Sequence, residues 1–168
     1  MTASAIEFAN TVVAKRGTLR DGLDGWLAEA GHPAAADRFR ELRDAVRGLL
    51  SAATGGGEFA AADLAVVNAA SSAAPRWPVL AHEADGTLTV REESVRADRT
   101  AEALAELAQD AVHLLGGPQR QELRACQGPG CVQFFVKDHP RREWCGPGCG
   151  NRARAARHYQ KHREQQAS

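Results

Sequence analysis

Apolar side chains recur at every third or fourth position over most of the chain up to Leu115, which is the spacing of amphipathic helices. The pattern predicts helices over 23–30, 33–53, 59–70 and 94–115, and an opening helix that ends at Gly17. The residues expected to face a common core are Ile6, Ala9, Val12, Val13, Phe39, Leu42, Val46, Leu49, Leu50, Leu64, Val66, Val67, Leu104, Leu107, Ala111, Leu114 and Leu115.

The pattern changes after the helix predicted over 59–70, where two runs of β-prone residues replace the helical spacing. The runs 77–82 and 87–90 flank a segment that contains an Asp-Gly pair, which is typical of a hairpin turn. This part of the chain therefore predicts a mainly helical α+β domain with one small β-hairpin. We expect Trp26 and Trp77 to anchor the core or the hairpin.

The helical part contains no group of residues with the spacing of a known catalytic device. It has no Gly-rich phosphate loop after a strand, no HExxH helix and no nucleophile elbow. Asn10 and Thr11, with Lys15 and Arg16 a turn later, could bind an anion, but the helix dipole alone favours basic residues there. We therefore expect no enzymatic activity. Three histidines are isolated along the chain and are interpreted as structural or solvated: His32, His82 and His113.

Composition is that of an ordinary globular protein. Of the 168 residues, 43% are hydrophobic and 25% are charged, which argues against a disordered chain. No apolar run approaches the roughly 18 residues of a membrane span, and the first residues lack the pattern of an export signal. We expect a cytoplasmic protein with no membrane partner.

The formal net charge of zero conceals a division of charge along the chain. Residues 1–119 carry 11 Lys and Arg against 17 Asp and Glu, whereas residues 120–168 carry 10 against 4. Such a division often means that the basic part meets a polyanion. We expect one domain over 1–119 and a smaller one over 120–168.

All four cysteines lie in the basic segment, as two close pairs: Cys126 with Cys131, and Cys145 with Cys149. A tetrahedral zinc site needs four thiolates at about 2.3 Å from one ion, and each pair encloses a Gly-Pro-Gly turn that holds it close. The N–H groups of such turns can point at the sulfurs and stabilise their charge. The spacing predicts one structural Zn²⁺ bound by these four cysteines.

Other interpretations of the cysteines fit the sequence less well. Disulfides suit small secreted proteins, a redox site suits a solitary C-x-x-C pair, and catalytic zinc keeps an open coordination position. One alternative stays open, in which His139 or His158 replaces a cysteine as a ligand.

The residues around the cysteines predict the shape of this module. Between the two pairs, the β-prone runs 132–136 and 141–144 surround a polar turn, which favours a hairpin that links the pairs. After Gly150 the chain has strong helix-forming residues and no breaker. This order is that of a treble-clef-like zinc finger ending in a basic helix.

The tetrapeptide Cys149-Gly150-Asn151-Arg152 is the one that names the CGNR zinc-finger family, which this segment resembles. Residues 134–136 and 141–145 resemble that family too, whereas 137–140 departs from it, because a small hydroxyl residue is expected there. In that family the finger follows a helical ABATE domain, and residues 7–12 and 24–27 are similar to its start. The resemblance implies a transcription regulator that acts in a stress response, and it supplies no mechanism.

The basic residues of the finger are candidates for nucleic-acid contacts. Arg154, Arg157 and Lys161 share one helix face through i, i+3 and i, i+4 spacing, and a basic helix can enter a major groove. The full set expected to contact DNA is Arg141, Arg142, Arg152, Arg154, Arg157, Lys161 and Arg163. Three roles stay open: Arg152 could bond hairpin carbonyls, Asn151 could cap the helix or the turn of the second cysteine pair, and Tyr159 could stack on a base or pack on the finger.

These observations together predict a DNA-binding regulator whose acidic domain responds to an unidentified small molecule or mediates dimerisation. Since one finger contacts few base pairs, we expect a homodimer to bind any specific site. The alternative is a finger that docks on a partner protein, or on the acidic domain of the same chain, without binding DNA.

Overall fold

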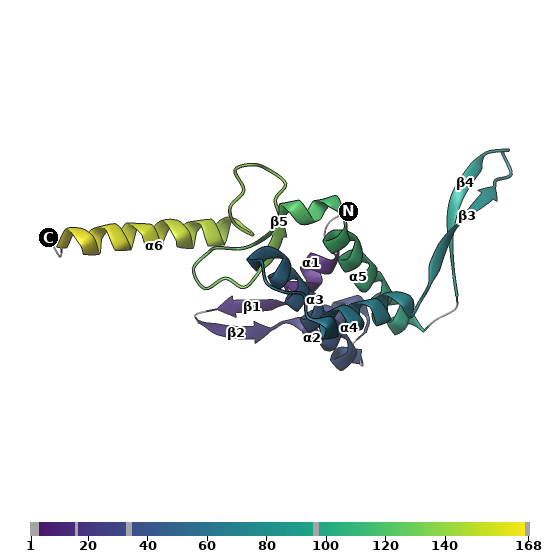
Figure 1. Cartoon of the computed structure of the whole chain (residues 1–168), viewed down its shortest axis with the longest axis horizontal. Coiled ribbons are helices and arrows are strands. Elements are labelled where there is room, and N and C mark those ends of the chain that lie inside the picture. Colours follow the sequence, from purple (N-terminus) through teal and green to yellow (C-terminus); the bar gives the residue numbers. More distant parts are fainter. Residues whose placement is uncertain (1–3, 16, 33–34, 96–97, 167–168) are drawn as a thin grey trace.

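The computed structural model describes residues 4–15, 17–32, 35–95 and 98–166, arranged as in Figure 1. Their helices are α1 (Ser4–Ala9), α2 (Leu23–Ala30), α3 (Ala36–Gly55), α4 (Ala61–Ser72), α5 (Arg99–Gly116), η2 (Pro118–Glu122) and α6 (Pro147–Gln166). Antiparallel hairpins are formed by β1 (Val12–Lys15) with β2 (Thr18–Asp21), β3 (Arg76–His82) with β4 (Leu88–Ser94), and β5 (Leu123–Ala125) with β6 (Phe134–Val136). The mainly helical α+β class is confirmed.

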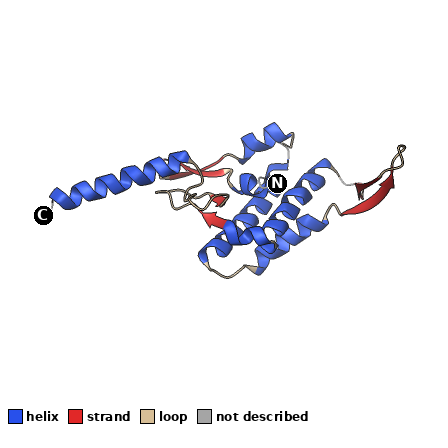
Figure 2. Ribbon diagram, turned by 90° about the horizontal axis from the view of Figure 1, so that it is seen from above, coloured by secondary structure: helices blue, strands red, loops and turns tan. Residues whose placement is uncertain are grey.

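The helices α1 to α5 form a body whose core lies along α3. As predicted, the apolar stripe of α3 is buried, and Phe39, Leu42 and Val46 are at most 1% exposed. Phe8 of α1 is fully buried against the rings of Phe39 and Trp26. Figure 2 shows the body helices side by side, with α6 on one side and the β3–β4 hairpin on the other. None of the described helices is long and apolar enough to cross a membrane.

The predicted opening helix is wrong in its second half. α1 ends at Ala9, and Val12 and Val13 lie in β1, because β-branched side chains pack well on a pleated surface. Gly17 has a φ of +79°, which allows the tight turn into β2. Arg16, part of the candidate anion site, lies outside the described residues.

Two helix starts and one core residue also differ from the prediction. α3 begins at Ala36, while Pro33 lies outside the described residues, and α5 begins at Arg99 because β4 continues to Ser94. Leu64 was expected to face the core but is 43% exposed, since α4 buries Val67 instead.

The β3–β4 hairpin is confirmed, and it projects from the body as an arm (Figure 1). Leu80 pairs with Val90 in its register, and both side chains are about 70% exposed on the same face. Trp77 lies in this hairpin as predicted but is 42% exposed, so it is not a core anchor. An ion pair between Arg76 and Glu106 of α5 ties the base of the arm to the body.

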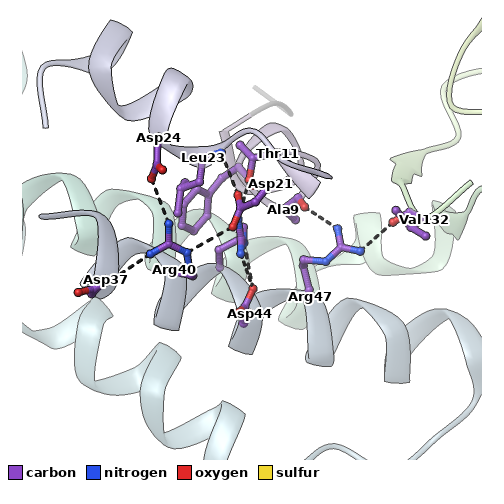
Figure 3. A network of polar contacts seen from close by, with 12 residues as sticks. Ala9, Thr11, Asp21, Leu23, Asp24, Asp37, Arg40, Asp44, Arg47 and Val132 are labelled. Carbon is purple, nitrogen blue, oxygen red and sulfur yellow. Dashed lines mark hydrogen bonds and ion pairs between the residues drawn. The ribbon is translucent and has the colours of Figure 1, made fainter. Parts of the chain in front are cut away.

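A polar network joins β2, α2 and α3 around Asp21 (Figure 3). The Asp21 carboxylate accepts hydrogen bonds from the guanidinium of Arg43, which is only 3% exposed, and from the backbone N–H of Leu23. Arg40 also pairs with Asp21, with a separation of 3.3 Å. The hydrogen bond from Arg43 lowers the pKa of Asp21 from 3.8 to about 2, although burial opposes the shift.

We expect Asp21→Asn to lower the free energy of unfolding by about 1 kcal/mol at neutral pH. A charge-assisted hydrogen bond contributes roughly 1.5–3 kcal/mol, and solvent at the partly exposed carboxylate reduces this value. Because the pKa of Asp21 is lower in the folded than in the unfolded state, its contribution to stability is complete above pH 3.8. That contribution is lost as the pH falls toward about 2. The stabilities of the two proteins should therefore converge over that interval.

Urea unfolding followed by circular dichroism measures this difference at each pH. Zinc release in acid affects both proteins equally, so the difference isolates Asp21. Asp37→Asn is the matched control, since Asp37 is fully exposed and pairs only with Arg40 across one helical turn. If Asp21→Asn still lowered the free energy of unfolding by the same amount at pH about 2, the ionised carboxylate would not be the source of the effect.

Candidate metal centre and basic helix

The four cysteine sulfurs converge on one point. The sulfurs of Cys126, Cys131, Cys145 and Cys149 all lie within 4.8 Å of one another. The sulfur of Cys145 is 3.7 Å from that of Cys131 and 3.4 Å from that of Cys149. Four sulfurs at 2.3 Å from a tetrahedral Zn²⁺ would be about 3.8 Å apart, so the donor set and its size fit zinc.

Short backbone segments bring the two cysteine pairs together. Cys126 directly follows β5, and the loop after it turns back through a hydrogen bond from the N–H of Cys131 to the carbonyl of Gly128. A Cβ atom on Gly128 would lie 2.8 Å from the Cβ of Cys149, which is closer than real side chains approach. Cys149 lies in the first turn of α6, so the basic helix begins at the second cysteine pair, as the treble-clef-like order predicts.

The predicted hairpin within the insert is wrong. β6 pairs with β5, which precedes the first cysteine, and not with residues 141–144. Those residues form turns, in which the N–H of Arg142 binds the carbonyl of His139. The pairing with β5 is favoured because Leu123 and Phe134 are both buried in the core that the body helices share.

Hydrogen bonds from the finger support negative charge on two sulfurs. The N–H of Cys145 lies 3.3 Å from the sulfur of Cys126, and the guanidinium of Arg152 lies 3.0 Å from the sulfur of Cys149. Although burial opposes it, the N–H groups of Cys145 and Gly128 lower the pKa of the Cys126 thiol. The sequence left open whether Arg152 is structural, and here it contacts a candidate zinc ligand.

In the second cysteine pair, the pKa values of the thiols are raised. Burial raises the pKa of the Cys145 thiol strongly, and the sulfurs of Cys149 and Cys126 raise it further. Burial also raises the pKa of Cys149. Four thiolates at this spacing therefore need a cation between them, and a divalent metal that binds thiolate supplies it.

The two histidines considered as ligands lie apart from the sulfurs. The Nδ1 atom of His139 accepts a hydrogen bond from the N–H of Arg141. His158 is on the exposed part of α6, where its Nε2 atom lies 3.2 Å from that of His162. Neither belongs to the four-residue cluster.

Arg142 is held within the finger. Its guanidinium donates to the carbonyls of Trp144 and Cys145, pairs with Asp138 at 2.9 Å, and lies 5.0 Å from the ring centre of Phe135. These contacts fix the segment that leads to the second cysteine pair. The sequence could not reveal them, because a basic residue beside a finger fits phosphate binding equally well.

The remaining basic candidates are exposed, four of them on a helix that leaves the body (Figures 1 and 2). The exposed set is Arg141, Arg154, Arg157, Lys161 and Arg163. Asn151 lies inside α6, which begins at Pro147, so it does not cap the helix; its side chain accepts a hydrogen bond from Arg154. Tyr159 is 71% exposed beside His158. The basic helix therefore does not lie along the acidic body, which argues against docking within the chain.

Two side chains of the body hold the finger in place. The amide of Asn10 bonds both backbone groups of Phe134, at 2.8 and 2.9 Å. Arg47 reaches from α3 to the carbonyls of Ala9 and Val132, at 2.6 and 2.9 Å (Figure 3). Asn10 therefore has a structural role in place of the anion contact considered from the sequence.

The sequence carries one signal for this contact surface, which was not used in the predictions above. Arg43 and Arg47 are one turn apart and border the apolar stripe of α3. An arginine in that position has to find buried partners.

Comparison with known proteins gives two matches. The model of the ABATE family, described as "putative stress-induced transcription regulator", matches residues 2–118. The model of the CGNR zinc finger matches residues 122–162. No curated protein matches the chain.

Proposed function

This chain belongs to the ABATE family and ends in a CGNR zinc finger, and on that premise we propose that it is a non-enzymatic transcription regulator that binds DNA through the finger and α6. The observation that carries the proposal is the basic face of α6, which is exposed and directed away from the acidic body. A free basic helix anchored by a metal site can approach a major groove without steric conflict with the body.

The charge distribution supports the same proposal. The finger segment 120–168 is basic while 1–119 is acidic, so the field of the whole chain would orient α6 toward a polyanion. Arg142 and Arg152 bond the carbonyl of Cys145 and the sulfur of Cys149, at the metal cluster itself. We therefore assign the phosphate contacts to the other five basic residues.

Fluorescence anisotropy of the zinc-loaded full chain with a labelled duplex tests the proposal. The duplex has a length of about 30 base pairs, and its sequence is taken from the promoter region beside the gene. This length can hold two half-sites one helical turn apart. We expect the logarithm of the association constant to fall with the logarithm of the salt concentration, with a slope of roughly −0.9 for each phosphate contact. An unrelated duplex of equal length should bind more weakly, and it measures specificity.

Absence of binding at about 50 mM salt, with zinc fully bound, would reject DNA in favour of a finger that docks on another protein. In that case the exposed face of α6 should retain a defined protein partner in a pull-down. Binding that is indifferent to sequence would reduce the function to general affinity for nucleic acid.

A groove on the acidic body is the place that we propose for a small-molecule effector. It has a volume of about 450 Å³ and lies between α3 and α4, lined by alanines and larger apolar side chains together with Arg38 and Glu41. A small molecule that binds there would raise the melting temperature by mass action. The bulky substitution Ala69→Trp should abolish that rise, and an unchanged rise would place the effector elsewhere.

A further inference from the structure

Two exposed histidines lie side by side on α6, beyond the finger. His158 and His162 are one helical turn apart, their ring centres are separated by 4.4 Å, and their Nε2 atoms are separated by 3.2 Å. Residues at i and i+4 share a helix face, so the backbone itself presents both imidazoles in one direction. Neither ring belongs to the four-cysteine cluster, and α6, which carries both, extends away from the body.

The separation of the two nitrogen atoms matches the bite of a metal chelate. Imidazole nitrogen binds zinc and similar ions at about 2.0–2.1 Å. Two such nitrogens are about 2.9 Å apart when their bonds to the ion form a right angle. They are about 3.3 Å apart when the bonds form a tetrahedral angle. The observed 3.2 Å is the length of a hydrogen bond between the two rings, and it lies between these limits. The spacing of the two nitrogens therefore suits one ion, which would replace the proton of that hydrogen bond.

We propose that His158 and His162 form a second metal site, which chelates one exchangeable divalent transition ion. Neutral imidazole suits Ni²⁺, Cu²⁺ and Zn²⁺, whereas the harder Mg²⁺ and Ca²⁺ prefer oxygen ligands. Water completes the coordination because both rings are exposed. The site differs from the cysteine cluster in ligand type, exposure and place on the chain, and it does not depend on whether α6 binds DNA.

The surroundings of the pair set the strength of this site. Arg154 and Lys161 are close to the pair along the helix, and their positive charge opposes a cation. Two ligands without a carboxylate make a weaker site than four thiolates. The ion at the histidines therefore exchanges freely while the zinc at the cysteines stays bound.

Calorimetric titration of the zinc-loaded full chain with Ni²⁺ tests the proposal. We expect one Ni²⁺ to bind per chain, and elemental analysis after gel filtration should still find the original zinc. His162→Gln should weaken Ni²⁺ binding roughly tenfold or more, because the second imidazole otherwise binds at a high effective concentration. His158→Gln should have the same effect.

A rearranged variant separates chelation from mere histidine content. The double substitution Gln160→His with His162→Gln leaves composition and charge unchanged but puts the two imidazoles two residues apart, on different faces of α6. It should lose as much Ni²⁺ affinity as His162→Gln, whereas His82→Gln, at an exposed and isolated histidine, should lose none. Wild-type affinity in the rearranged variant would overturn the proposal, as would Ni²⁺ binding that displaces zinc from the cysteines.

Discussion

Cys145→Ser is expected to abolish zinc binding and to unfold the finger while most of the helical signal of the body survives. The four clustered sulfurs cannot all ionise without a cation, and the finger has only a small core of its own. Elemental analysis should find about one zinc per wild-type chain and well under one per variant chain. Circular dichroism should retain the contribution of α2 to α5.

The body should nevertheless become less stable when zinc is lost. Leu123 and Phe134, on either side of the first cysteine pair, are buried in the core of the body helices. Partial loss of their packing would cost about 2 kcal/mol, which corresponds to a fall of roughly 10 °C in melting temperature. An unchanged melting temperature would show that β5 and β6 contribute nothing to the body.

Two further variants sharpen the zinc prediction. Gly128→Ala should weaken zinc binding without removing any ligand, because the added Cβ would meet the Cβ of Cys149 at 2.8 Å. His139→Ala is the matched control, since its ring lies outside the cluster, and it should leave the zinc content unchanged. Zinc loss in His139→Ala, or well under one zinc in wild-type protein purified without chelator, would contradict the four-cysteine site.

The second large effect concerns the exposed basic face of α6. We expect Arg157→Gln and Lys161→Gln each to flatten the salt dependence of DNA binding by about one unit. Each should also weaken binding roughly tenfold at about 50 mM salt, because the loss of one phosphate contact removes the release of its counterion. Anisotropy titrations at several salt concentrations measure both quantities.

Controls for this series distinguish contact from folding. Arg38→Gln makes the same change of charge at an exposed position on α3 and should leave the slope unchanged. Arg142→Gln should weaken binding together with zinc retention, because that guanidinium bonds the carbonyls of Trp144 and Cys145. An equal change of slope for Arg38→Gln would show that net charge, and not the face of α6, controls affinity.

Local signals in the sequence predicted the elements whose structure is decided locally. α2 ends at Ala30, and Gly31 has the left-handed conformation expected directly after a helix. The arm follows from an Asp-Gly turn between β-prone runs, and Gly86 has a φ of +87°. The short strands β1, β2 and β5 were not predicted, because three or four residues are too few to show a clear alternating pattern. The run that contains β6 was predicted as a strand, but its partner is β5 and not residues 141–144.

In the candidate site, too, the locally determined features could be predicted and the long-range contacts could not. The cysteine spacing alone placed the metal cluster, since short glycine turns leave each pair little freedom. The partners of Asn10 and Arg47 could not be predicted, because they lie 124 and 85 residues away in the sequence. The roles of Arg142 and Arg152 were also hidden, because a guanidinium that bonds carbonyls or sulfur looks the same in sequence as one that binds phosphate.

Because Phe134 of the finger is buried in the core of the body helices, we expect the abundance of the protein in the cell to depend on its supply of zinc. A chain that lacks the metal would release β6 from Asn10 and expose an apolar segment that the native core covers. Segments of this kind are cleaved when a domain opens locally, and a loss of 1–2 kcal/mol can change steady-state abundance several-fold. Newly made chains that fail to acquire zinc would therefore be degraded faster than loaded ones, and their half-life in zinc-depleted cells should shorten accordingly.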